Sequence, residues 1–176
     1  MKFFNGFSLK DEEHFFDAYR DESHYTICGF SYGAIKAFEA TKNTLREGKR
    51  VDRLQLFSPA FFQTKDEKFK RLQLMAYRKN EDVYLNQFIN ACFFPYERED
   101  VTRSVTVIEE LEELLYYEWS LEELEELSRR GVIVEVYLGD EDAIVDAKAA
   151  KEFFLEVTTV TYISNANHFL INSNRR

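Results

Sequence analysis

The segment HYTICGFSYGAIKAFEATKNTLREG (24–48) decides the fold of this chain. Residues 24–30 are β-branched and aromatic, which predicts a buried strand. Residues 31–48 predict a helix that stops at Gly48, because apolar residues recur on one helical face: Ile35, Phe38 and Leu45. The pentapeptide Gly29-Phe30-Ser31-Tyr32-Gly33, a G-x-S-x-G pattern, lies where the strand meets the helix.

A serine at the centre of such a turn has a strained backbone, and its hydroxyl projects from the edge of the sheet. Gly29 and Gly33 leave room for the strand and the helix to approach each other. Ser31 is therefore a candidate nucleophile. Taken alone, the five residues also fit an ordinary glycine-rich turn, so the chemistry depends on finding partners for the serine.

A nucleophilic serine needs a base, and the base needs an acid that orients it. In a strand-turn-helix context of this kind the three follow in the order serine, acid, histidine. His14 and His24 precede Ser31 and are expected at the surface. His168 follows the last predicted strand, at its carboxyl end, and is the candidate base.

The acid is expected in the loop GDEDAIV (139–145), which follows a predicted strand. Asp142 is the preferred candidate, because the G-x-x-D spacing carries its side chain past the strand end toward the histidine. Asp140 remains the alternative, and Glu141 is expected to point away. Two backbone N–H groups would hold an oxyanion: that of Tyr32 and that of Phe7, in the turn after the first strand.

Strands and helices also alternate in the rest of the chain, on either side of one long insertion. Strands are predicted at 2–7, 51–57, 132–138 and 157–163, and helices at 9–20, 107–119, 120–131 and 147–157. The fold class is therefore α/β, with a mostly parallel five-stranded sheet that is covered on both faces. Residues 1–60 and 131–176 form the core, and residues 61–130, which show no convincing strand, form a helical lid inserted after the third strand.

Composition limits the partners and the compartment. The 176 residues carry 23 basic and 32 acidic side chains, a net charge of −9, so nucleic acid and anionic membranes are not expected as partners. Two cysteines make no disulfide scaffold, and there is no membrane span or signal peptide pattern. A reduced, soluble, cytoplasmic protein is expected. No metal-ligand cluster or phosphate-binding glycine loop is present, so no cofactor is predicted.

Four short motifs together resemble the α/β-hydrolases. NGF (5–7), GFSYG (29–33), GDED (139–142) and NH (167–168) match the oxyanion turn, nucleophile elbow, acid loop and histidine of that fold in order and spacing. The chain looks like a minimal version, because the strand and helix that usually lie between the first turn and the elbow are missing. In the familiar strand order that strand lies outside the first one, so its loss trims an edge and spares the site.

Within this fold, the chain is similar to the short pimeloyl-[acyl-carrier protein] methyl ester esterases of biotin synthesis. The likeness rests on the small size and on KFFNGF (2–7), GFSYGAIKA (29–37), LFSPA (56–60) and FKRLQL (69–74). It implies hydrolysis of the methyl ester of a pimeloyl chain carried on acyl carrier protein. Another serine hydrolase, such as an acyl-carrier thioesterase or a small-ester esterase, and a non-catalytic acyl-carrier-binding module remain alternatives.

The insertion carries a local basic segment that suits an acidic carrier protein. Residues 65–79 have a charge of +4, six basic minus two acidic side chains. The docking candidates are Lys65, Lys68, Lys70, Arg71, Arg78 and Lys79. A solvated helix face explains the same charges equally well.

Apolar residues of the same segment could line an acyl channel or pack the lid: Phe61, Phe62, Phe69, Leu72, Leu74 and Met75. The glutamates of 109–126 are interpreted as a solvated acidic face that turns away from the carrier protein. Cys28 is expected to be a small buried residue rather than a nucleophile.

Overall fold

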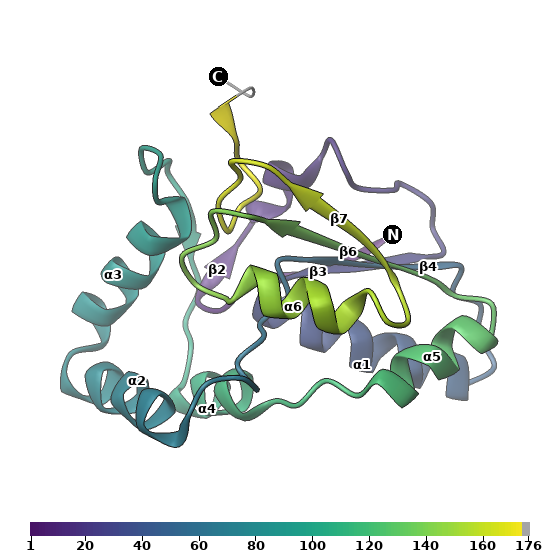
Figure 1. Cartoon of the computed structure of the whole chain (residues 1–176), viewed down its shortest axis with the longest axis horizontal. Helices are drawn as coiled ribbons and strands as arrows, with labels where there is room; N and C mark the ends of the chain where they lie inside the picture. The colour runs from purple at the N-terminus through teal and green to yellow at the C-terminus, as the bar shows by residue number, and fades with distance from the viewer. Residues whose placement is uncertain (174–176) are drawn as a thin grey trace.

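The computed structural model of the chain describes residues 1–173, so the last three residues of the predicted core segment 131–176 lie outside the described part. One sheet runs through the molecule, in the order β1-β3-β4-β6-β7 (Figure 1). Its strands are β1 (Lys2–Phe4), β3 (Thr26–Phe30), β4 (Arg53–Phe57), β6 (Ile133–Gly139) and β7 (Thr159–Ile163). All neighbouring strands are parallel, which confirms the predicted α/β class and the five strands.

The α-helices that connect the strands lie on one face of the sheet. These are α1 (Tyr32–Arg46), α5 (Leu121–Arg129) and α6 (Ala147–Phe154), which bury their apolar residues against alternate side chains of the strands (Figure 1). Since the strands follow the chain in one direction across the sheet, crossovers of one hand place their helices on one side. One face of the sheet is therefore covered by α-helices.

The second face is covered by shorter segments. Phe15 and Phe16 come from the 3₁₀ helix η1 (Glu12–Phe16), and Phe169 comes from the segment after β7. They pack on Cys28, Phe30 and Phe57 of the strands. The link from β1 to β3 thus runs over the face opposite α1 and has the opposite hand, which brings η1 under the turn at the end of β1.

The helix predicted over 9–20 does not form. The structure has β2 (Leu9–Lys10) and then η1 in its place. Asp11 separates the two, and its φ of 63° is left-handed, so a helix cannot continue through this residue. Phe15 lies on Phe169 and Phe16 stacks on Phe57, each with 4.7 Å between ring centroids. These rings belong to distant segments of the chain, so tertiary packing overrides the local helical pattern.

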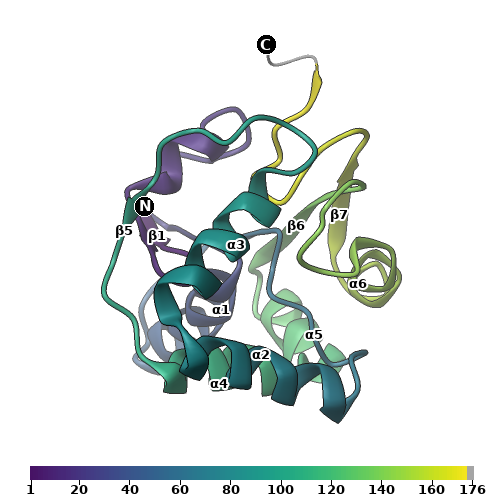
Figure 2. The same cartoon turned by 90° about the vertical axis from the view of Figure 1, so that its left-hand side faces the viewer.

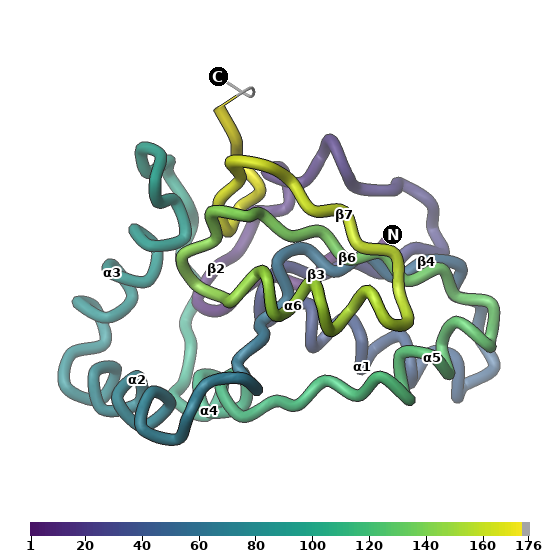
Figure 3. Tube along the Cα trace, viewed as in Figure 1, coloured from purple at the N-terminus to yellow at the C-terminus, as the bar shows by residue number. Residues whose placement is uncertain are grey.

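The lid consists of α2 (Glu67–Lys79), α3 (Glu81–Phe93) and α4 (Ile108–Tyr116). These helices stand at the end of the sheet to which the strands point, with α2 running across α4 (Figure 2). The trace leaves β4 for the lid and returns along the sheet through α5 into β6 (Figure 3). The predicted insertion 61–130 therefore includes one helix, α5, that packs with the sheet.

A short strand inside the insertion was not predicted. β5 (Thr102–Arg103) pairs antiparallel with β2, which ties the lid to the N-terminal segment. Two residues are too few to show an alternating pattern, so the sequence gives no signal for it. Within residues 1–173, no helix is both long enough and apolar enough to cross a membrane.

Capping side chains and glycines mark several helix ends. The Ser120 hydroxyl accepts the Glu123 N–H at 3.3 Å at the start of α5, and Asp146 accepts the Ala149 N–H at 3.0 Å at the start of α6. Gly48 and Gly131 follow α1 and α5 with φ of 73° and 87°, a conformation that glycine adopts without a steric penalty.

Candidate active site

Ser31 stands on a strained turn between β3 and α1. Its φ of 53° and ψ of −115° are unusual for a residue with a side chain. A Cβ at Gly29 would lie 2.1 Å from the Gly33 carbonyl oxygen, and a Cβ at Gly33 would lie 2.0 Å from the Phe4 carbonyl oxygen. The two glycines are therefore required by close backbone approach, as the G-x-S-x-G pattern predicts.

The structure brings together the three side chains that the sequence singled out. The His168 Nε2 lies 3.0 Å from the Ser31 Oγ, and the His168 Nδ1 lies 2.6 Å from the Asp142 Oδ2. The side chains of His168 and Asp142 are fully buried. With Asp142 ionised, Nδ1–H donates to the carboxylate and Nε2 is left to accept the serine proton.

The carboxylate of Asp142 is itself held in place. Its Oδ1 accepts the backbone N–H groups of Ile144 at 2.8 Å and Val145 at 3.1 Å, which leaves Oδ2 for the histidine. Asp140 and Glu141, the other carboxyls of the loop, are exposed. Of the acids that the sequence left open, only Asp142 contacts His168.

The histidine loop is fixed against the acid loop and the lid. A Cβ at Gly139 would lie 2.2 Å from the Ala166 carbonyl oxygen, and the Glu141 N–H donates to that oxygen at 2.9 Å. The amide of Asn167 donates to the Phe93 carbonyl oxygen at 2.9 Å and accepts the N–H groups of the two residues Phe169 and Ile171. Asn167 thus holds the backbone beside His168, a positioning role that its sequence position alone did not indicate.

The remaining histidines and the cysteines take no part in the hydrogen bonds that join Ser31, His168 and Asp142. His14 and His24 are exposed, as expected. Cys28 and Cys92 are free and fully buried. Burial raises the pKa of the Cys28 thiol to about 12, so this thiol stays protonated and unreactive.

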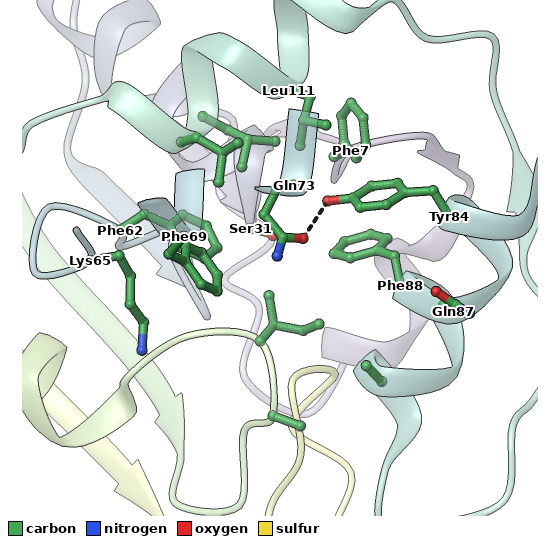
Figure 4. A pocket seen from close by; sticks show the side chains of 15 residues that line it. Phe7, Ser31, Phe62, Lys65, Phe69, Gln73, Tyr84, Gln87, Phe88 and Leu111 are labelled. Atoms are coloured by element: carbon green, nitrogen blue, oxygen red, sulfur yellow. Dashed lines mark hydrogen bonds between the residues drawn. The ribbon is translucent and has the colours of Figure 1, made fainter. Parts of the chain in front are cut away.

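A cavity of about 330 Å³ opens beside Ser31. Figure 4 shows Phe62 and Phe69 on one side of the serine and Phe7, Tyr84 and Phe88 on the other. The apolar lining is completed by Ala91, Leu111, Leu114, Leu115, Ala143 and Ile144, and the polar lining by Lys65, Gln73 and Gln87. A largely apolar cavity with a few polar groups suits an acyl chain.

Only two of the predicted channel residues line this cavity, Phe62 and Phe69. Phe61 and Leu74 are buried in the core, whereas Leu72 and Met75 are exposed on the outer side of α2, at 52% and 62%. Sequence reasoning missed the wall formed by α3, although its members follow one helical face with the spacing i, i+3, i+4, i+7: Tyr84, Gln87, Phe88 and Ala91.

One polar group in the cavity has a fixed orientation. The Tyr84 hydroxyl donates to the Gln73 Oε1 at 3.0 Å, which leaves the Gln73 amide N–H₂ as the donor of that side chain (Figure 4). A donor of this kind among apolar walls suits a carbonyl oxygen of a bound chain.

The backbone donors predicted for an oxyanion lie near the serine. Phe7 lines the cavity together with Ser31, and Tyr32 is the first residue of α1. Their donor roles remain predictions. Phe3 and Phe4 of β1 are half-buried.

The predicted docking residues are not equally available. Lys68, Arg78 and Lys79 are exposed, and Lys65 lies at the rim of the cavity. Arg71 is exposed and pairs with Glu67 at 3.0 Å. Lys70 has to be removed from the set, because it is only 8% exposed and its ammonium lies 4.9 Å from the centre of the Tyr116 ring.

Three glutamates of the acidic insertion contact α1. Glu113 accepts a hydrogen bond from Tyr32, Glu110 pairs with Lys36 at 3.1 Å, and Glu123 pairs with Lys42 at 3.0 Å. All three basic or phenolic partners belong to α1. Glu113 and Glu123 are exposed, as a solvated face predicts, but these three glutamates also fasten the insertion to the helix behind the serine.

Solved structures similar to this chain share its fold. They include the esterase EaEST from Exiguobacterium antarcticum (TM-score 0.61, 16% identity, 85% of this chain and 62% of that one). They also include Est816, described as an N-acyl homoserine lactone degrading enzyme (0.63, 11%, 95% and 85%), and naproxen esterase from Bacillus subtilis (0.52, 20%, 82% and 53%). No protein-family model and no curated protein sequence matches the chain.

These similarities define the class: the chain has an α/β-hydrolase fold in a minimal form. The matched region spans about half of naproxen esterase and about three fifths of EaEST. The sheet also agrees with the expected trimming, because β1 is an edge strand and no strand of residues 1–173 lies outside it.

Proposed function

We propose that this protein is a serine carboxylesterase. The observation that carries the proposal is the hydrogen-bonded series Ser31, His168 and Asp142, which opens on a mostly apolar cavity. A strained serine, a buried histidine and an oriented carboxylate form the constellation that acyl transfer to a serine requires.

The geometry supports a two-step reaction. The Ser31 Oγ attacks the ester carbonyl carbon while His168 Nε2 takes the hydroxyl proton, and the oxyanion forms near the N–H groups of Phe7 and Tyr32. His168 then gives the proton to the leaving alcohol, and the C–O bond breaks to leave an acyl-enzyme. Water, deprotonated by the same nitrogen, attacks the acyl-enzyme and releases the acid and Ser31.

We further propose the methyl ester of pimeloyl-acyl carrier protein as the substrate. The resemblance of the sequence to the short esterases of biotin synthesis suggests it, and two features of the molecule support it. The cavity has apolar walls for a methylene chain, and the Gln73 amide supplies one donor for a carbonyl along that chain.

The charges on the outer face of α2 support the proposal of an acidic partner such as acyl carrier protein. Lys68, Arg71 and Lys79 are exposed there beside the apolar side chains of Leu72 and Met75. Both side chains of the Arg71–Glu67 ion pair are exposed, so the pair is weak. Arg71 can therefore leave Glu67 and bind a carboxylate or phosphate of a partner. With Lys65 and Arg78, these residues form the proposed docking surface.

A gel-shift assay on methyl-pimeloyl-acyl carrier protein, with wild type and Ser31→Ala, tests this function. Conversion to the free-acid carrier by the wild type alone is the expected result. Loss of the acyl chain from the carrier would identify a thioesterase instead. An unchanged carrier, with hydrolysis of a p-nitrophenyl ester retained, would reject the proposed substrate and keep the serine esterase. No hydrolysis of any ester would favour a non-catalytic acyl-carrier-binding module.

A further inference from the structure

A buried carboxyl group lies directly behind the turn that carries Phe7. Glu12, the first residue of η1, is 1% exposed, and its Oε1 accepts the backbone N–H of Gly6 at 2.5 Å. Its Oε2 is also buried and has no hydrogen-bond partner among residues 1–173. Burying an acid with half of its hydrogen-bonding capacity unused is unfavourable, so the contact with Gly6 calls for an explanation.

This contact fixes the peptide group next to the reacting atoms. The Gly6 carbonyl oxygen accepts the Leu9 N–H at 3.2 Å, so both backbone polar groups of Gly6 are held. The Gly6–Phe7 peptide bond is trans and planar, and its N–H therefore points away from the carbonyl and from Leu9. Phe7 lines the cavity beside Ser31, where an oxyanion would form.

Gly6 also packs closely against the strand that carries the serine, because a Cβ at this residue would lie 2.8 Å from the Phe30 ring. From these contacts we infer that Glu12 is a positioning residue of the active site: its carboxyl group holds Gly6 so that the Phe7 N–H is aimed at the oxyanion. The inference rests on the proposed serine esterase function.

Three variants and one control test the inference. Glu12→Gln keeps an oxygen that can accept the Gly6 N–H, whereas Glu12→Leu removes the acceptor and keeps the apolar part. Glu12→Asp shortens the side chain by one methylene and withdraws the oxygen. Glu13→Gln, at the exposed neighbour, is the matched control. For each variant, kcat and KM on a p-nitrophenyl ester, the affinity of a trifluoromethyl ketone that forms a tetrahedral adduct, and Tm are measured.

We expect Glu12→Leu to lower kcat and ketone affinity by about 10- to 100-fold with little change in KM, since one oxyanion donor can contribute about 10²–10³ in kcat. Glu12→Gln should recover most of both. If Glu12→Leu does not fold, Glu12→Asp against Glu12→Gln gives the same comparison. The role of Glu12 is overturned if kcat is unchanged in a folded Leu or Asp variant, or if the Gln variant loses as much kcat as the Leu variant. Either result leaves the proposed serine esterase function standing. A wild type without any esterase activity refutes the serine esterase and, with it, this role.

Discussion

The hydroxyl of Tyr32, the residue that follows Ser31, donates a hydrogen bond to the Glu113 carboxylate on α4. One turn further along α1, the Lys36 ammonium pairs with Glu110 at 3.1 Å, and the Glu110 carboxylate also accepts the Thr106 hydroxyl at 2.6 Å. Burial and the Glu113 carboxylate together raise the pKa of Tyr32, so the phenol remains a donor at physiological pH. The helix that begins at the serine is therefore bonded directly to the lid.

Removing this hydroxyl should loosen the lid and spare the serine turn. We expect Tyr32→Phe to lower the free energy of unfolding by about 1.5–3 kcal/mol, the range for a hydrogen bond to a charged acceptor. Limited proteolysis should cut α4 faster than in the wild type. Tyr116→Phe is the control, because its hydroxyl contacts Glu67 at the surface. Equal protease resistance in the two variants would mean that the Tyr32 contact does not hold the lid.

Asp142 should be required for turnover and Asp140 should not. We expect Asp142→Asn to lower kcat by about 10³–10⁴, since an amide no longer selects the tautomer in which His168 Nε2 accepts the serine proton. Steady-state kinetics on a p-nitrophenyl ester measures this loss. Asp140→Asn, at an exposed position of the same loop, should keep kcat within about twofold. Similar losses of kcat in both variants would show that turnover depends on the conformation of the loop and not on the contact between Asp142 and His168.

The close approach of backbone at Gly33 should make it irreplaceable. A Cβ there would lie 2.0 Å from the Phe4 carbonyl oxygen, so Gly33→Ala must push β1 away from the serine turn. We expect a loss of at least about 3 kcal/mol in the free energy of unfolding, measured in urea. Gly48→Ala is the control: its φ of 73° is strained for alanine, but no atom lies within 4 Å, so about 1 kcal/mol is expected. A Gly33→Ala variant as stable as Gly48→Ala would contradict the crowded turn.

Charge reversal on α2 should separate carrier-bound from free esters. We expect Lys68→Glu with Arg71→Glu to raise KM for methyl-pimeloyl-acyl carrier protein by about tenfold at low salt and to leave p-nitrophenyl ester hydrolysis unchanged. The control reverses Arg46 and Lys49, at the C-terminal end of α1 far from the lid. Equal losses on both substrates, or an equal effect of the control, would count against docking on α2.

The stability of the protein should fall as pH rises through the titration of Glu12. Burial, with smaller contributions from the Asp11 and Glu13 carboxylates, raises the pKa of Glu12 from 4.5 to about 7. The folded state therefore binds this proton more tightly than the unfolded state, and the difference is lost between pH 4.5 and 7. We expect a contribution of at most about 3 kcal/mol to this decline. Urea unfolding from pH 5 to 8 should show a shallower decline in Glu12→Gln, and parallel curves would contradict the raised pKa.

The sequence predicts the candidate active site well because its three side chains are tied to short motifs at strand ends. Ser31, Asp142 and His168 were each placed by spacing after a recognisable strand, and they meet in the structure. The segment 9–20 could not be predicted from periodicity, because its phenylalanines pack on rings from distant segments such as Phe57 and Phe169.

Other features depend on contacts that sequence patterns do not reveal. The burial of Glu12 reflects the path of η1 under the turn at Gly6, and neither a charged residue nor its neighbours signal such burial. The partnership between the acidic lid and α1 likewise requires segments about 80 residues apart to meet, as Tyr32 and Glu113 do with a separation of 81. The apolar spacing of α3, in contrast, was visible in the sequence and would have located one wall of the cavity.

The most direct test of the central claim is to locate the residue that a fluorophosphonate probe labels. Mass spectrometry should find the adduct on Ser31 in the wild type, no adduct in Ser31→Ala, and labelling at least about 10³-fold slower in His168→Ala. Ser58→Ala, which alters a buried serine at the end of the neighbouring strand β4, should label like the wild type. Labelling at another residue, or labelling of Ser31 at an undiminished rate without His168, would contradict the proposed catalytic serine.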